Sequence, residues 1–158
     1  MHEVEIVGVR VEMPSNQPIV LLRELSGERY VPIWIGAVEA TAIAFTQQGV
    51  TPPRPLTHDL IAEILRSHQI DLERVHIVEV KDNIFHAELV FSTGLQVNAR
   101  PSDAIAIALR LGAPVFCSEQ VLTEASVFVP DEQEDEVERF REFLDHVSPE
   151  DFEEGREP

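Results

Sequence analysis

The feature that most constrains the fold is the stretch of residues 98–112, NARPSDAIAIALRLG, which predicts one buried helix. Pro101 has a fixed φ that suits a first helical turn, Ser102 can cap free N–H groups, and Asp103 suits the positive end of the helix dipole. Residues 104–109 are apolar on every helical face, and such a helix lies inside a protein. Only the start of this helix is polar, so this start either anchors a loop or forms a small site for an anion.

A second stretch repeats this pattern 64 residues earlier in the chain. Residues 33–45, IWIGAVEATAIAF, align with residues 97–109, VNARPSDAIAIAL, so that Glu39 falls opposite Asp103. Each predicted helix follows three strand-like runs, which indicates an internal duplication. A chance likeness between two alanine-rich helices is the alternative. The predicted fold class is therefore α+β, with duplicated β-β-β-α units, a mainly antiparallel sheet and a C-terminal acidic helix.

The periodicity of apolar residues predicts the individual elements. Strands are expected at residues 2–13, 19–25, 30–35, 75–81, 84–91 and 95–99, and helices at residues 37–48, 58–67 and 101–111. A slip in the alternation predicts a bulge near Gly8, Thr57 is expected to cap the second helix, and Asp82 with Asn83 suits a two-residue hairpin turn. After a short strand at residues 115–117, only irregular turns are expected.

Charge is distributed unevenly along the chain. The net charge is −17, and residues 131–158 contain 13 acidic residues and 3 arginines, which leaves −7 for residues 1–130. Broad electrostatic capture of nucleic acid depends on Lys and Arg, so a nucleic-acid substrate would need a local basic patch or bound cations. We expect one domain at residues 1–130. Apolar residues at helical spacing in 131–158 predict an acidic amphipathic helix that docks on the body or on a protein partner, followed by a disordered end.

The sequence also bears on location in the cell. No run approaches the roughly 18 apolar residues of a membrane span, and the N-terminus MHEVEIVGV lacks a basic region before an apolar stretch. Cys117 is the single cysteine, which excludes a disulfide within the chain and indicates a small core residue. We therefore expect a cytoplasmic protein without membrane contact.

Four separate motifs resemble one known family. PIWIGAVEA (residues 32–40), RPLTHDL (54–60), DNIFHAEL (82–89) and NARPSDAIAIALR (98–110) resemble, in matching order, the bifunctional nuclease (BFN) family. The resemblance covers residues 4–130 and implies an α+β fold of duplicated units, frequently a homodimer. It also implies nuclease action on both RNA and DNA, as described for plant relatives. Asn98 stands where relatives often carry Asp, which would remove one metal ligand.

A few polar side chains could carry such chemistry. Hydrolysis of a phosphodiester needs a neutralised phosphate, an activated water and a proton for the leaving oxygen. Arg100 could clamp a phosphate, or it could tie its turn to a carboxylate such as Asp103 or Glu39. Glu39 and Asp103 could share Mg²⁺ or Mn²⁺, or serve only as partners of the helix dipoles. His58 could pass a proton, since imidazole titrates near neutral pH, or could orient the loop before it. Ser102 suits a cap better than a nucleophile.

Three functional hypotheses follow. The first is a divalent-cation-dependent nuclease acting on RNA and DNA, with His58, Arg100 and Asp103 as catalytic residues and with Glu39 and Asp103 as metal ligands. We expect these four side chains to converge in one cleft. The second is a non-enzymatic dimeric binding or regulatory module, which the low basic content favours. The third is a metal-dependent hydrolase of small phosphorylated molecules. In each case the large apolar surface predicts a homodimer.

Overall fold

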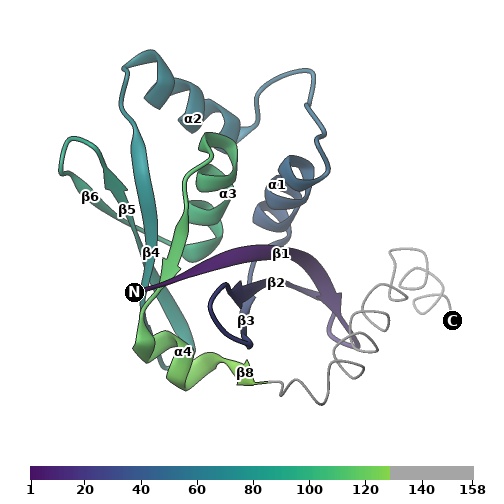
Figure 1. Ribbon diagram of the computed structural model, residues 1–158. Helices are drawn as coiled ribbons and strands as arrows, with labels where there is room; N and C mark the ends of the chain where they lie inside the picture. The colour runs from purple at the N-terminus through teal and green to yellow at the C-terminus, as the bar shows by residue number, and fades with distance from the viewer. Residues whose placement is uncertain (129–158) are drawn as a thin grey trace, which may run out of the picture.

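The computed structural model describes residues 1–128, which form eight strands and four helices around one sheet (Figure 1). The strands are β1 (His2–Glu12), β2 (Gln17–Glu24), β3 (Arg29–Trp34), β4 (Leu72–Lys81), β5 (Ile84–Phe91), β6 (Gln96–Ala99), β7 (Val115–Cys117) and β8 (Val127–Phe128). The helices are α1 (Ala37–Gln47), α2 (Thr57–Ser67), α3 (Pro101–Leu111) and α4 (Glu119–Ala125). The predicted α+β class is confirmed. The helix and tail predicted for residues 131–158 lie outside the described residues.

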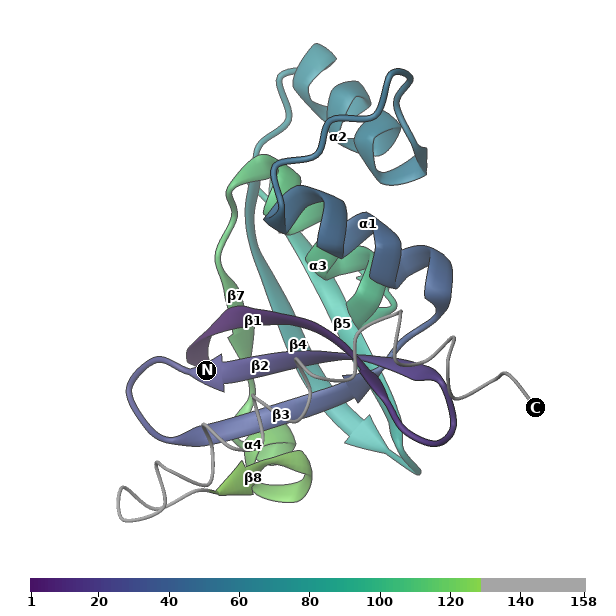
Figure 2. The ribbon, with the colours of Figure 1, turned by 90° about the vertical axis from the view of Figure 1, so that its right-hand side faces the viewer.

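Two antiparallel meanders make up most of the sheet, whose strand order is β6-β5-β4-β7-β1-β2-β3-β8. The short strand β7 joins the meanders, because it pairs antiparallel with β1 and parallel with β4. Every other pairing in the described sheet is antiparallel, as predicted. In Figures 1 and 2 the strands β1–β3 run in a clearly different direction from β4 and β5.

The order β-β-β-α occurs twice along the described chain, with α2 between the two units. Helix α1 begins at Ala37 and α3 begins at Pro101, and they end at Gln47 and Leu111, so both boundaries keep the 64-residue offset. The element order is therefore the one that the sequence predicts. A common origin of the two units stays a prediction, which superposition of the two halves would test.

Helices α1 and α3 lie side by side on the sheet, α1 against β1 and β2, and α3 against β4 and β5 (Figure 2). The predicted all-round burial of α3 is confirmed, since all residues from Ala104 to Ala108 are buried. Cys117 also lies in the core, and burial raises the pKa of its thiol to about 12. Within residues 1–128, every helix is too short or too polar to cross a membrane.

Arg110 fastens three helices together. Its side chain is 7% exposed and donates hydrogen bonds to the Asp59 carboxylate on α2, to the Ala42 carbonyl on α1 (3.0 Å) and to the Ala106 carbonyl on α3 (2.8 Å). Burial alone would raise the pKa of Asp59, but hydrogen bonds from Arg110 and from the Leu56 N–H outweigh burial, and the pKa is lowered. This charged contact holds α2 against the other two helices.

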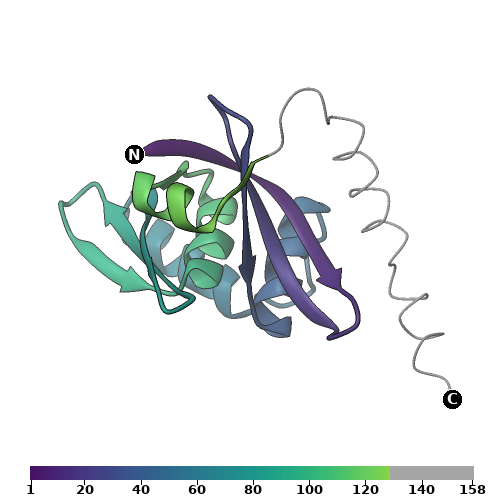
Figure 3. The same cartoon turned by 90° about the horizontal axis from the view of Figure 1, so that it is seen from below.

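Two local predictions were wrong. Helix α2 begins at Thr57 itself, and the Leu56 N–H donates to Asp59 Oδ2 (3.0 Å), so an acidic residue in the first turn replaces the expected cap. Residues 119–128 form α4 and β8 rather than irregular turns, because Ser118 caps α4 and the helix buries two apolar side chains on the core. Figure 3 shows α4, in green, on the near side of the sheet, where it contacts β3 and β4.

The other two local predictions were right. The register of β1 against β2 shifts between Ile6 and Gly8, which confirms the bulge. Asp82 and Asn83 both have positive φ, 52° and 63°, as a two-residue hairpin turn requires.

Candidate functional site

The starts of three helices carry the predicted site residues. Glu39 lies in the first turn of α1, and His58 lies in the first turn of α2. Arg100 is the residue directly before α3, and Asp103 lies in the first turn of that helix. Because α1 and α3 pack against each other and α2 packs on α3, their N-terminal side chains can meet.

Hydrogen bonds link these four side chains, which we call the helix-start cluster. Arg100 Nη2 donates to Glu39 Oε1 over 2.7 Å, and Arg100 Nε donates to Asp103 Oδ2 over 2.8 Å. The other oxygen of Asp103, Oδ1, lies 2.8 Å from Nε2 of His58. Side chains from the starts of three different helices, which lie up to 64 residues apart in sequence, are thus in direct contact. Their catalytic and metal-binding roles stay predictions.

The cluster is graded in depth. The exposed fractions of the side chains are 65% for Arg100, 29% for Asp103, 14% for Glu39 and 7% for His58. The hydrogen bond from Arg100 to Glu39 raises the pKa of the guanidinium above its ordinary value, and the hydrogen bond to Asp103 adds a smaller effect in the same direction. Arg100 is therefore a fixed positive charge at the surface, whereas His58 can act on a bound molecule only through Asp103.

Gly36 lets Glu39 reach Arg100. The Glu39 carboxylate lies over Gly36 so closely that a Cβ at position 36 would collide with Oε2. Gly36 has φ −78° and ψ 159°, values open to any residue, so the space and not the backbone requires glycine here. The motif IGAVE thus places a carboxylate beside the start of the other unit's helix.

The side chains present do not fit the predicted metal site. The Arg100 guanidinium lies where a cation shared by Glu39 and Asp103 would be expected, and it bonds both carboxylates. The remaining Asp103 oxygen is taken by His58. In the described part of the chain, no group of three His, Cys, Asp or Glu side chains could hold a metal ion. The positive charge of this site comes from the protein itself.

Arg100 also lines a hollow of about 280 Å³, which we call the Arg100 hollow. Its other walls come from the end of β3, the β4–β5 hairpin and the start of α3. The remaining members of the helix-start cluster do not line this hollow, although all four side chains meet as predicted; a cleft shared by all four stays a prediction.

Two residues of the Arg100 hollow were missed by reasoning from sequence. Trp34 is 53% exposed at the end of β3, where Val31 and Ile33 on the opposite face are buried. A large aromatic residue in the exposed phase of a strand was the available signal. Ser102 is 5% exposed. The sequence suggested that Ser102 caps α3, but its side chain makes no capping hydrogen bond. Among residues 1–128 its hydroxyl has no hydrogen-bond partner.

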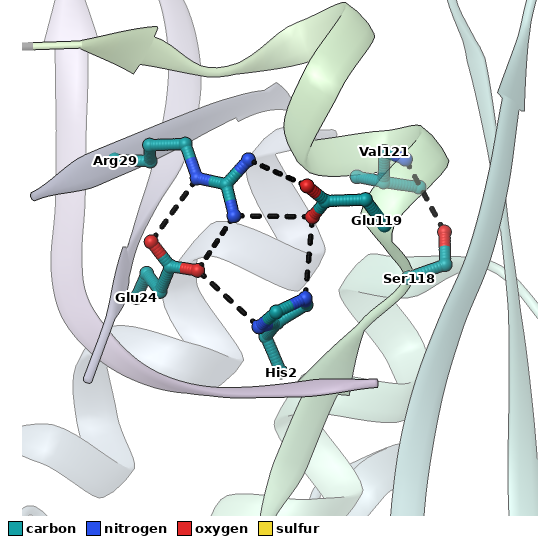
Figure 4. Close-up of polar contacts among 6 residues, drawn as sticks. All are labelled: His2, Glu24, Arg29, Ser118, Glu119 and Val121. Carbon is teal, nitrogen blue, oxygen red and sulfur yellow. Dashed lines mark hydrogen bonds and ion pairs between the residues drawn. The ribbon is translucent and has the colours of Figure 1, made fainter. Parts of the chain in front are cut away.

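A second group of charged side chains lies at the other end of β3 (Figure 4), and we call it the Arg29 cluster. Arg29 bonds the buried Glu24 (2.8 Å) and the exposed Glu119 (3.1 Å), and His2 lies between the two carboxylates at 3.4 and 3.2 Å. The hydrogen bond from Arg29 lowers the pKa of Glu24. These contacts join β1, β2, β3 and α4, which indicates a structural role.

The fold and the helix-start cluster define a class: α+β proteins of two β-β-β-α units with arginine, carboxylate and histidine side chains meeting at helix starts. The bifunctional nuclease domain family matches residues 20–130, and the chain belongs to this family. The uncharacterized proteins MT1877 and Rv1829, from two strains of Mycobacterium tuberculosis, are each 53% identical over 161 residues. Each alignment covers 96% of this chain and 98% of the relative.

Proposed function

We propose that this protein is a nuclease that hydrolyses phosphodiester bonds in RNA and DNA, with the helix-start cluster as its site. The observation that carries the proposal is the exposed Arg100 guanidinium, held between two carboxylates with a buried histidine behind one of them. Membership of the bifunctional nuclease domain family supports the reaction type.

Each side chain has a distinct task in this proposal. Arg100 holds a non-bridging phosphate oxygen and offsets its charge. Asp103, the more exposed carboxylate, takes a proton from the attacking water as the new P–O bond forms. That proton then passes to the leaving oxygen as the old P–O bond breaks. His58 is a positioning residue, because it is buried and holds Asp103. Glu39 keeps Arg100 in place.

The proposal includes dependence of the nuclease activity on Mg²⁺ or Mn²⁺, which has to be measured. Because the described side chains do not form a ligand set, we assign no step to a cation. Assays with EDTA, Mg²⁺ and Mn²⁺ would show whether one must accompany the substrate.

The test is cleavage of labelled RNA and single-stranded DNA by tag-free protein. Arg100→Ala and Asp103→Ala should each lower the rate by about 100-fold or more, in the range typical of lost phosphate or proton contacts. Arg23→Ala is the matched control, since Arg23 is a partly exposed arginine of β2 that is likewise paired with a carboxylate, Glu5, and should leave the rate unchanged. Equal rates in all variants would assign the cleavage to a contaminating nuclease.

Two observations about charge favour a second candidate, a non-enzymatic binding or regulatory module. Two carboxylates already neutralise Arg100, and the whole chain carries a net charge of −17, both of which weaken the attraction for a polyanion. Binding without cleavage under every cation condition would select this candidate.

A further inference from the structure

We propose that the Arg100 hollow binds one unpaired nucleotide, with its base stacked on Trp34 and its phosphate at Arg100, Ser102 and the start of α3. This inference rests on the proposed function and names the part of the substrate that the site would recognise. The hollow of about 280 Å³ is slightly smaller than the roughly 300–1,000 Å³ of drug-sized ligand pockets, so it has room for no more than one nucleotide.

The phosphate end is built from α3. Pro101 has no N–H, and the Ala104 N–H bonds the Arg100 carbonyl, which leaves the N–H groups of Ser102 and Asp103 without a partner inside the helix. Such N–H groups at a helix start attract anions. Ser102 is buried and is one of the residues that line the hollow, and its hydroxyl has no partner in the described part of the chain. A buried hydroxyl without a partner is costly, and a phosphate oxygen would satisfy it.

Charge agrees with this orientation. Arg100 is the single charged residue among those that line the hollow, although the chain is strongly acidic. Glu39 and Asp103 hold the guanidinium from outside the hollow. Its Nη1 has no hydrogen-bond partner within residues 1–128, so it has donors left for a phosphate.

The base end is aromatic and apolar. Trp34 is 53% exposed and Ile84 is 60% exposed, and Phe85 completes this wall. Stacking on an aromatic side chain needs a base that is free of its duplex, so this geometry selects single strands, loops or ends. The amide of Asn83, at the tip of the β4–β5 hairpin, lines the same hollow and can meet the polar edge of a base.

Trp34 is the only tryptophan of the chain, so its fluorescence reports this contact directly. The probes are a 12-nucleotide thymidine oligonucleotide, an abasic oligonucleotide with the same phosphates, and a blunt duplex, titrated at low salt in EDTA. The thymidine oligonucleotide should quench Trp34 emission by about half or more, because stacked bases quench indole. The abasic oligonucleotide and the duplex should quench far less.

Three variants separate binding from folding, with affinity measured by anisotropy of a labelled oligonucleotide. Trp34→Ala should weaken binding roughly tenfold or more, and Trp34→Phe should stay close to the wild type. Ser102→Ala should weaken binding roughly tenfold while the melting temperature stays the same or rises, because it removes a buried hydroxyl that has no partner. A lower melting temperature with unchanged affinity would overturn the role of Ser102 in holding phosphate.

The outcomes distinguish this inference from the proposed nuclease activity. Cleavage without quenching would overturn the nucleotide site and leave the nuclease proposal standing. Quenching without cleavage would leave the nucleotide site standing and remove the nuclease. Equal quenching by the abasic oligonucleotide would overturn stacking on Trp34. A red shift of Trp34 emission on dilution of the protein alone would show that a second copy of this chain covers the hollow, which would also overturn the inference.

Discussion

Because Gly36 has no side chain, the Glu39 carboxylate can lie over it and bond Arg100 of the second β-β-β-α unit. An alanine at this position would push the Glu39 carboxylate away from Arg100 without straining the backbone. We expect Gly36→Ala to lower the nuclease rate about tenfold and to change the melting temperature by no more than a few degrees, since the displaced atoms are the end of a flexible side chain. Steady-state cleavage assays and thermal unfolding would measure both effects.

Gly27→Ala is the matched control for this substitution. Its Cβ would collide with a carboxylate in the same way, but with that of Glu24 in the Arg29 cluster. It should alter stability and leave the cleavage rate unchanged. A Gly36→Ala protein with the full rate would show that Glu39 is dispensable for holding Arg100.

Glu24 ties stability to pH. Its folded-state pKa lies below the ordinary value because Arg29 bonds the carboxylate, so the charged form stabilises the fold. This contribution is complete above the ordinary pKa of about 4.5 and is lost as pH falls through the lower folded-state pKa. At pH 7, Glu24→Gln should reduce the free energy of unfolding by about 1–3 kcal/mol.

Urea unfolding at several pH values would measure this difference between the two proteins. The gap should narrow as the pH falls below 4. A gap that stays constant from pH 7 to pH 3 would contradict the assignment of the effect to the Glu24 charge.

At the scale of elements, Arg110 is the clearest single target. Replacing it with methionine keeps most of the apolar stem but removes the donor to Asp59 Oδ1 and to the Ala42 carbonyl, and leaves Asp59 with the Leu56 N–H alone. Removing one partner of such a buried pair costs about 3–5 kcal/mol. We expect Arg110→Met to lower the free energy of unfolding by this amount, as measured by urea unfolding.

Arg66→Met is the control for the loss of an arginine on the same helices. Arg66 is 55% exposed, its ion pair with Glu63 spans 3.9 Å, and it donates one hydrogen bond to the Arg110 carbonyl over 2.7 Å, so its loss should cost about 1 kcal/mol, well below the loss expected for Arg110. Equal losses in both variants would show that Arg110 does not act as the fastening of α1, α2 and α3.

The elements were largely predictable from sequence because their signals are local. Alternation, the slip near Gly8 and the turn at Asp82 and Asn83 each depend on neighbouring residues, and all appear in the structure. The short α4 was missed because its seven residues carry too few apolar positions to show a period, although Ser118 supplied a cap signal. The place of β7 between β1 and β4 was also missed, since pairing across the chain leaves no local trace.

The candidate site was predictable in part for the same reason. The 64-residue offset predicted that Glu39 and Asp103 occupy matching positions in two helices, and the alternative in which Arg100 ties its turn to these carboxylates describes the observed contacts. The contribution of Trp34 and Ser102 to one hollow depends on how the β4–β5 hairpin folds over the end of β3. No spacing in the sequence encodes that arrangement.

For the whole molecule, the exposed apolar side chains indicate self-association. Leu60 and Ile64 on α2 are each 50% exposed, and Leu95 and Val97 at the β6 edge of the sheet are 60% and 38% exposed. We expect a homodimer, because exposed apolar surfaces of this kind mark contacts with other chains and β6 is an edge strand of the described sheet. Light scattering at micromolar concentration should give about twice the chain mass of 17.8 kDa.

The matched measurement is a dilution series of the same sample. A mass near 17.8 kDa at every concentration would contradict the homodimer. The protein partner predicted for the acidic segment 131–158 stays a separate prediction, which pull-down with and without that segment would test.

The position of β7 sets an order in which the molecule can be completed. Its three residues, Val115–Cys117, are the bridge between β4 and β1, yet they are made after both meanders. While the ribosome is still making the chain, the edges of β1 and β4 that face β7 stay unpaired until residue 117 has emerged. A nascent or shortened chain that stops before Val115 would leave the edges of β1 and β4 unpaired in addition to those of β3 and β6, and unpaired edges promote aggregation. The three residues of β7 therefore also determine when, during synthesis, the edges of β1 and β4 stop being available for pairing with other chains.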